Sequence, residues 1–233
     1  AAIKMEVQRS GPPKPGFLEK IRQLCNKNGI ILIFDECTSG FRESFGGIHK
    51  KYSVEPDMAI FGKALGNGYA ITSVIGTKSI MESAQTTFIS STFWTERIGP
   101  SAALKTLEVM EQLESWEIIK KQGIYLQNGW QSIAERNNLE LKLNSFPSLA
   151  SFNIQSKNMQ KYKTLITQEM LKKGYLATNT CYLSINHSNK IIDDYLNCLE
   201  DVFRLISKCE SEEIKIDDLL ESEICHSGFK RLN

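Results

Sequence analysis

The sequence predicts an α/β protein, because short apolar runs alternate with segments of helical periodicity. Residues 1–7 are typical of a strand, and Phe17–Asn28 repeats its apolar residues with a helical period that stops at Gly29. Ile30–Phe34 then forms a second apolar run. This order predicts a strand–helix–strand unit with parallel strands and a right-handed crossover. A mostly parallel sheet with flanking helices is therefore expected in the first part of the chain.

The pattern changes near the middle of the chain. Before that point, the sequence predicts strands at 57–61 and 70–75 and helices at 78–84, 100–114 and 117–137. After it, the sequence predicts strands at 139–143, 149–154 and 182–185 and helices at 159–173 and 191–209. We therefore place a domain boundary near 114–118 and predict three parts, which are a partial large domain at 1–115, a small α+β domain at 116–209 and a peripheral charged tail at 210–233.

Composition excludes several classes of function. The 233 residues are 41% hydrophobic, and 28 Lys+Arg against 27 Asp+Glu leave a formal charge of +1, which argues against a nucleic-acid-binding surface. No apolar run approaches the roughly 18 residues of a membrane span. The six cysteines contain no C-x-x-C pair, so a zinc site is not expected. Free thiols and the lack of a recognisable signal peptide predict a cytoplasmic protein.

A carboxylate and an amine each follow an apolar run. Asp35 comes directly after Ile30–Phe34, and Lys63 follows the run 58–61. The carboxyl ends of parallel strands meet at one edge of a sheet, which is where open α/β sheets bind ligands. A lysine that forms a Schiff base and an acid that holds the pyridine nitrogen are the two groups that pyridoxal phosphate requires. The pair therefore predicts a pyridoxal-phosphate site.

Each of these residues also has a structural interpretation. Lys63 stands between Gly62 and Gly66, and glycines allow a backbone to approach a ligand closely, but Lys63 could equally be a surface lysine in a turn. Asp35 could cap the next element. Glu36 points elsewhere if the strand continues, so we assign it a supporting role.

Other polar residues give weaker signals. The loop 90–94 offers hydroxyls and amides that could bind a phosphate or satisfy their own backbone. Two arginines in the expected active-site loops are candidate anion binders or ion-pair partners, and three isolated histidines are read as surface or structural residues. These residues are Arg42, Arg97, His49, His187 and His226.

Three stretches of sequence, in this order and spacing, resemble class III aminotransferases of the type I pyridoxal-phosphate fold, closest to the glutamate-1-semialdehyde aminomutase-like branch. The stretches are 31–42 (ILIFDECTSGFR), 56–68 (PDMAIFGKALGNG) and 91–93 (STF). The resemblance extends to about residue 207. It implies the C-terminal part of a type I large domain followed by a small α+β domain, and an upstream segment that is missing from this sequence.

The resemblance also implies roles for single residues. Lys63 would form the Schiff base and move the substrate proton, and Asp35 would pair with the pyridine nitrogen. Cys37 occupies a position that packs on the cofactor ring. Thr92 would bind the cofactor phosphate of a neighbouring subunit, which implies a homodimer with shared active sites. The substrate would be a small-molecule amine.

Two departures from the family pattern bear on the substrate. Asn67 and the dipeptide Tyr69-Ala70 replace the usual residues of the lysine loop, and 181–188 (CYLSINHS) lacks the arginine that grips an α-carboxylate in many relatives. The sequence leaves open whether the amino group moves within one molecule or between two. A hypothesis of another class is a catalytically inactive remnant that acts as a protein-binding or structural subunit.

Overall fold

The computed structural model describes residues 1–8, 11–92 and 95–228. The chain divides into two compact units, 1–119 and 120–233, and the division lies within helix α4 (Ser115–Arg136). Each unit has its own sheet and its own buried core. The two units are therefore described separately.

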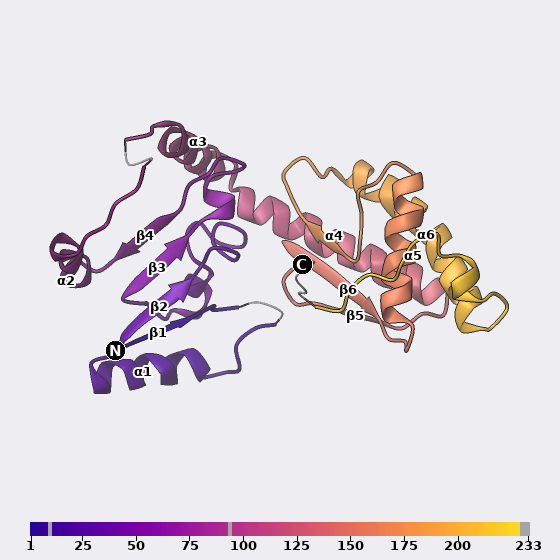
Figure 1. The fold of residues 1–233 in the computed structure, drawn as a ribbon, viewed down its shortest axis with the longest axis horizontal. Coiled ribbons are helices and arrows are strands. Elements are labelled where there is room, and N and C mark those ends of the chain that lie inside the picture. The colour runs from indigo at the N-terminus through magenta and orange to yellow at the C-terminus, as the bar shows by residue number, and fades with distance from the viewer. Residues whose placement is uncertain (9–10, 93–94, 229–233) are drawn as a thin grey trace. The chain divides into compact units, whose positions relative to one another are not determined.

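The first unit is built on a four-stranded sheet in the order β1-β2-β3-β4 (Figure 1). The first three strands are parallel, and β4 pairs antiparallel with β3 at one edge. The predicted α/β class with a mostly parallel sheet and flanking helices is thus confirmed. The strands span Ala2–Met5 (β1), Ile31–Asp35 (β2), Met58–Phe61 (β3) and Ser73–Gly76 (β4).

Helix α1 (Phe17–Asn28) connects β1 to β2, as the strand–helix–strand pattern predicts. It ends because Gly29 adopts the left-handed conformation, with φ of 60°, and donates its N–H to the carbonyl of Cys25. The helix buries Leu18 and Cys25, and burial of a leucine side chain contributes about 1.5–3 kcal/mol. The helix therefore covers the sheet and fixes where β2 begins.

Strand β2 alternates between two environments. Leu32 and Phe34 are fully buried, whereas Ile31, Ile33 and Asp35 are partly exposed. Alternation of this kind follows from the two-residue period of a strand. The strand extends one residue further than the apolar run suggests, so Asp35 is its last residue and lies on the less buried face.

The remaining helices complete the first unit. They are η1 (Ile48–Tyr52), η2 (Lys63–Leu65), α2 (Lys78–Met81), η3 (Glu82–Thr86) and α3 (Ile98–Leu113). Ala59 and Phe61 of β3 pack with Leu65 and with Ala103 in a small core, and Ala103 lies in the long helix α3.

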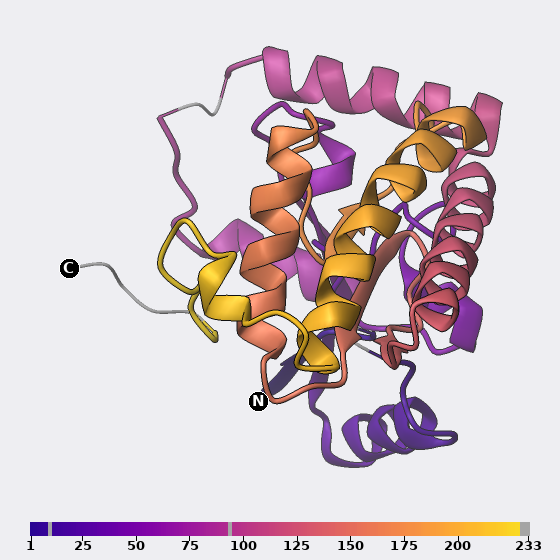
Figure 2. The ribbon, with the colours of Figure 1, turned by 90° about the vertical axis from the view of Figure 1, so that its right-hand side faces the viewer.

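The second unit combines a three-stranded antiparallel sheet, in the order β5-β6-β7, with long helices. Helices α5 and α6 pack side by side (Figure 2). The ring of Phe152 lies 4.8 Å from that of Trp130 and 5.7 Å from that of Phe203, so three buried aromatic side chains join the sheet to α4 and α6. The bounds are β5 Leu141–Leu143, β6 Leu149–Ile154, α5 Met159–Lys172, β7 Thr180–Tyr182 and α6 Asn189–Glu210.

The sequence predicts a strand at 182–185, but the observed strand β7 spans Thr180–Tyr182 and so begins and ends earlier in the chain. Beyond it the backbone turns, because the amide of Ser184 donates to His187 Nδ1 at 3.0 Å. The side chain of Ser188 then caps α6 by accepting from the amide of Ile191. Residues after α6 form η4 (Ile216–Asp218), whose Ile216 is buried.

Candidate active site

Asp35 and Lys63 lie at the carboxyl ends of neighbouring parallel strands. Strand β2 ends at Asp35, which pairs with Ile60 of β3, and Lys63 follows two residues after β3 ends. The sequence-based expectation that both polar groups emerge at one edge of the sheet agrees with this register. That edge is the ligand-binding edge in open α/β sheets.

The backbone at Lys63 is left-handed, with φ of 45°. A non-glycine residue in this region costs on the order of 1–3 kcal/mol, and such strain often marks a functional position. Three backbone hydrogen bonds hold the turn, among them those from the amides of Gly66 and Asn67 to the carbonyl of Lys63 at 3.1 and 3.2 Å. The turn directs the lysine so that its Nζ donates to Thr38 Oγ1 at 2.5 Å.

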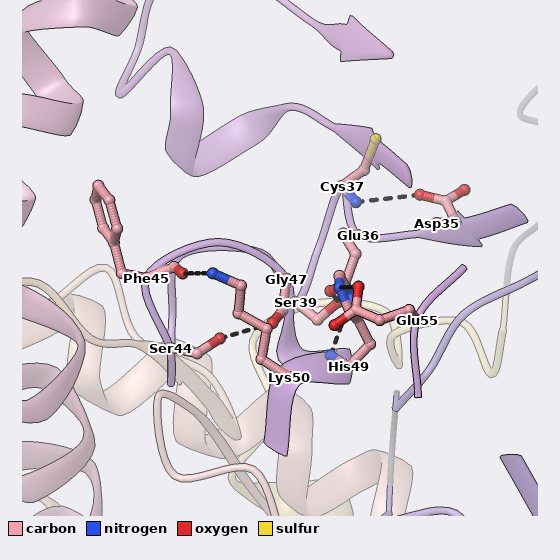
Figure 3. Close-up of polar contacts among 10 residues, drawn as sticks. All are labelled: Asp35, Glu36, Cys37, Ser39, Ser44, Phe45, Gly47, His49, Lys50 and Glu55. Carbon is pink, nitrogen blue, oxygen red and sulfur yellow. Dashed lines mark hydrogen bonds and ion pairs between the residues drawn. The ribbon is translucent and has the colours of Figure 1, made fainter. Parts of the chain in front are cut away.

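The segment after β2 brings the remaining groups together. The amide of Cys37 donates to Asp35 Oδ1 at 3.1 Å (Figure 3). A Cβ atom placed on Gly62 would lie 3.5 Å from Cys37 Sγ, so the thiol packs against the backbone that precedes Lys63. Asp35, Cys37, Thr38 and Lys63 therefore form one cluster.

Asp35 carries a second contact, from another strand. Lys4 Nζ lies 2.9 Å from Asp35 Oδ2. Burial raises the pKa of Asp35, but the hydrogen bond from Lys4 and the amide of Cys37 outweigh this effect, and the net pKa lies below the usual value. Asp35 is therefore an anion at neutral pH.

Cys37 is a neutral thiol in these surroundings. Burial is the largest effect that raises its pKa, and the neighbouring Asp35 raises it further, whereas Lys63 acts in the opposite direction. A raised pKa leaves little of the nucleophilic thiolate at neutral pH. This agrees with a packing role and not with a reactive thiol.

Glu36 points away from Asp35 into the protein (Figure 3) and is fully buried. Its carboxylate accepts hydrogen bonds from Ser39 Oγ at 2.5 Å and from the amide of His49 at 3.1 Å, and it lies 2.8 Å from His49 Nδ1. Burial raises the pKa of Glu36, but the bonds from His49 and Ser39 outweigh it, so the net pKa is lowered. The pair ties the loop 37–49 to the end of β2.

Gly47 leaves the space for this buried pair. A Cβ atom at Gly47 would lie 2.3 Å from His49 Nδ1 and 2.7 Å from Glu36 Oε1. Both distances are far shorter than real contacts of a Cβ atom. Because its φ of −80° is available to any residue, the close approach and not the backbone conformation requires glycine here.

The structure does not join Thr92 to this cluster. Thr92 is exposed in the segment before α3, and Phe93 and Trp94 of the same predicted loop lie outside the described residues. Of the two arginines, Arg42 donates from Nε to the carbonyl of Thr38 at 2.9 Å, and Arg97 is exposed directly before α3.

Sequence reasoning missed three features of the site. The first is Lys4, a single charge in an otherwise apolar strand. The second is the hydroxyl of Thr38. The third is the buried contact of Glu36 with His49. The charge of Lys4 within β1 is a detectable signal, whereas the other two contacts depend on how the loop closes.

The second unit contains a cavity of about 150 Å³. Tyr175, His187 and Tyr195 contribute to its lining, together with Cys181, whose pKa burial raises to about 11. None of the predicted site residues lines this cavity.

The cluster suits pyridoxal phosphate by the chemistry of its groups. An ionised carboxylate and a lysine amine lie at the ends of adjacent strands, with a neutral thiol and a hydroxyl beside them.

Within the described parts of the chain, no group of three or more His, Cys, Asp or Glu residues is placed to hold a metal ion. No described helix is both long and apolar enough to cross a membrane.

Two relatives illustrate what the sequence resembles. The 3-aminobutyryl-CoA aminotransferase of Cloacimonas acidaminovorans (strain Evry) is 36% identical over 157 residues, which are 67% of this chain and 38% of the relative. The glutamate-1-semialdehyde 2,1-aminomutase of Methanosphaera stadtmanae is 31% identical in an alignment of 206 positions that covers 81% of this chain and 48% of the relative. The chain thus spans less than half the length of either protein.

Solved structures share the fold. The FumI protein of Sphingopyxis sp. MTA144, in its PLP internal aldimine form, matches 94% of this chain and 55% of its own chain with a TM-score of 0.84 and 21% identity. An S-selective transaminase from Bacillus megaterium matches 90% of this chain and 52% of its own with a TM-score of 0.75, also at 21% identity. At this level of identity the likeness concerns the fold alone.

The family assignment rests on a family model that matches most of the sequence. The model of the family described as aminotransferase class-III matches residues 10–191, which include Asp35, Cys37, Lys63 and Thr92. Members of that family depend on pyridoxal phosphate. Because this match covers most of the sequence, the chain belongs to the class-III aminotransferase family.

Proposed function

We propose that this protein transfers amino groups with pyridoxal phosphate, and that Lys63 and Asp35 hold the reactive part of the cofactor. The observation that carries the proposal is their placement at the ends of adjacent parallel strands, next to the neutral thiol of Cys37. Family membership supplies the reaction class. The activity belongs to the whole protein, since the chain matches only part of its relatives.

Pyridoxal phosphate, when bound, supplies an electron sink for the carbon that bears the amino group. Asp35 would hold the ring nitrogen by its carboxylate, which is already ionised in this structure. A charge fixed in this way strengthens the electron sink because it favours the protonated nitrogen. Asp35 thus acts on the electronics of the reaction and not on the substrate directly.

Lys63 would bind the cofactor covalently through Nζ and would later move a proton. When a substrate amine displaces it, the free amine can remove the proton from the substrate carbon and return it at another position. The hydroxyl of Thr38, which accepts from Nζ at 2.5 Å, would orient the free amine for this transfer.

Two further assignments complete the proposed site. Cys37 would pack against the ring, which suits its neutral, partly buried side chain. Thr92 would bind the cofactor phosphate of a partner subunit, and its exposure leaves it free for such a contact. The assignment of Thr92 implies a homodimer, and we propose that the protein is cytoplasmic.

The proposed substrate is a small primary amine. The relatives named above include both an aminotransferase and an aminomutase, so transfer between two molecules and transfer within one are both represented. The stretch 181–188 contains no arginine, which argues against a standard binding site for an α-amino-acid carboxylate at that position. An added keto acid such as 2-oxoglutarate distinguishes the two reactions. Turnover of the amine-loaded protein with this keto acid would favour transfer between two molecules. No turnover with it would favour transfer within one molecule.

The direct test uses the full-length protein mixed with pyridoxal phosphate and then freed of excess cofactor. The wild type should show the visible absorption band of a lysine-bound cofactor, and Lys63→Ala should lose it. Lys50→Ala is the matched control, because Lys50 lies in η1 of the same unit and its Nζ donates to the carbonyl of Phe45. A band that persists in Lys63→Ala contradicts the proposal. A wild type without any band favours the structural-subunit alternative.

A further inference from the structure

Lys4 contacts the carboxylate that the proposed function assigns to the ring nitrogen. Its Nζ lies 2.9 Å from Asp35 Oδ2, and the two side chains are 57% and 23% exposed. The contact joins two strands, β1 and β2. It is therefore a property of the folded sheet and not of a local turn.

The register of the sheet explains why these two residues meet. Lys4 pairs with Ile33 in parallel register, so both side chains lie on the same face of the sheet. Asp35 is two residues beyond Ile33 on the same strand and also faces that side. The lysine and the carboxylate are thus diagonal neighbours, and a long side chain spans such a separation.

Both oxygens of Asp35 already have donors. Oδ1 accepts from the amide of Cys37 at 3.1 Å, and Oδ2 lies against Lys4. A carboxylate has about four acceptor positions, so a third donor can still bind. The negative charge, however, is shared between that donor and the ammonium of Lys4.

Sharing the charge has a definite consequence for a cation at this site. A protonated ring nitrogen beside Asp35 would be a second positive charge next to the first, and like charges disfavour one another. The other titratable groups near the pair are Glu6, Cys37 and Lys63, and the Cys37 thiol is neutral. Lys4 is therefore the cation in direct contact with Asp35 in the described structure.

We propose that Lys4 shares the Asp35 carboxylate with the ring nitrogen of bound pyridoxal phosphate and thereby weakens the hold of this nitrogen on its proton. The proposal rests on the proposed function of Asp35. Lys4 is a positioning residue, because it acts through Asp35 and does not reach the reacting carbon. It would make this site a less powerful electron sink than one that contains the carboxylate alone.

The test follows the ring nitrogen itself. The full-length protein is loaded with pyridoxal phosphate carrying ¹⁵N in the ring, and the ¹⁵N chemical shift is recorded against pH. Lys4→Met keeps the length of the side chain but removes its charge, and it should raise the pH at which the nitrogen loses its proton by about one unit. Lys4→Arg keeps the charge and should titrate like the wild type. Lys4→Gln is a second neutral variant in case Lys4→Met folds poorly.

A control separates this effect from a general loss of charge. Lys20→Met removes a positive charge from an exposed position of α1 and should leave the titration unchanged. Equal titrations of the wild type and both neutral Lys4 variants, with the cofactor still bound at Lys63, would overturn this inference and leave the proposed function intact. Failure of the wild type to hold the cofactor at Lys63 would instead overturn the proposed function.

Discussion

Asp35 and Glu36 are adjacent carboxylates with opposite surroundings. The side chain of Asp35 is 23% exposed and faces Lys4 on the next strand, whereas the side chain of Glu36 is fully buried. Asp35 is the last residue of β2 and lies on its less buried face, and the amide of Glu36 still donates to the carbonyl of Ile60 at 2.8 Å, so the alternation continues and places Glu36 on the opposite, buried face. The carboxylates of two adjacent residues, Asp35 and Glu36, therefore lie in different surroundings because they face opposite sides of the sheet.

The partners of the two residues differ in the same way. Ser39 and His49, which bind Glu36, both belong to the segment that follows β2, and His49 lies in η1, so the carboxylate holds this segment against the end of β2. Asp35 accepts one local amide and one ammonium from another strand. The comparison indicates that Glu36 maintains the loop, while Asp35 remains available to a ligand.

The largest expected effect on stability comes from replacing the buried carboxylate of Glu36. Glu36→Gln retains the shape but replaces an acceptor by a donor that faces Ser39 and His49. It should lower the free energy of unfolding by on the order of 3 kcal/mol. Asp35→Asn is the matched control on the neighbouring residue and should cost less than about 1 kcal/mol. Urea unfolding of both variants measures the difference, and equal losses would refute the assignment of Glu36 as the structural member.

A smaller effect should appear in acid. Burial opposes ionisation of Glu36, but its bonds to His49 and Ser39 lower its pKa in the folded protein. The stabilisation is therefore complete above the unfolded-state pKa of about 4.3 and is lost as the pH falls through the lower folded-state pKa. Unfolding free energies measured at several acidic pH values should fall less steeply with decreasing pH in Glu36→Gln than in the wild type. Identical slopes in Glu36→Gln and the wild type would show that Glu36 contributes no pH-dependent stability.

Much of the first unit could be predicted from local sequence. Helix α1 has the predicted bounds because an apolar periodicity and Gly29 define its two ends. The placement of Asp35 and Lys63 at one sheet edge follows from the apolar runs that precede them and from the parallel direction that the strand–helix–strand pattern predicts. These features did not require any knowledge of side-chain packing.

The contacts that distinguish this site could not be predicted in the same way. The meeting of Lys4 with Asp35 depends on the register between β1 and β2, and a shift of one residue would send Lys4 to the other face. The hydrogen bond of Lys63 to Thr38 and the burial of His49 depend on how a loop closes over glycines such as Gly47. Long-range register and loop closure leave no periodic signal in a single sequence.

The most direct measurement is to identify the lysine that carries the cofactor. The full-length protein is loaded with pyridoxal phosphate, treated with borohydride to fix the cofactor on its lysine, and mapped by peptide mass spectrometry. The account predicts that the modified peptide contains Lys63. Modification of Lys4 or Lys50 in place of Lys63, or of no lysine in a protein that retains the cofactor, would contradict it.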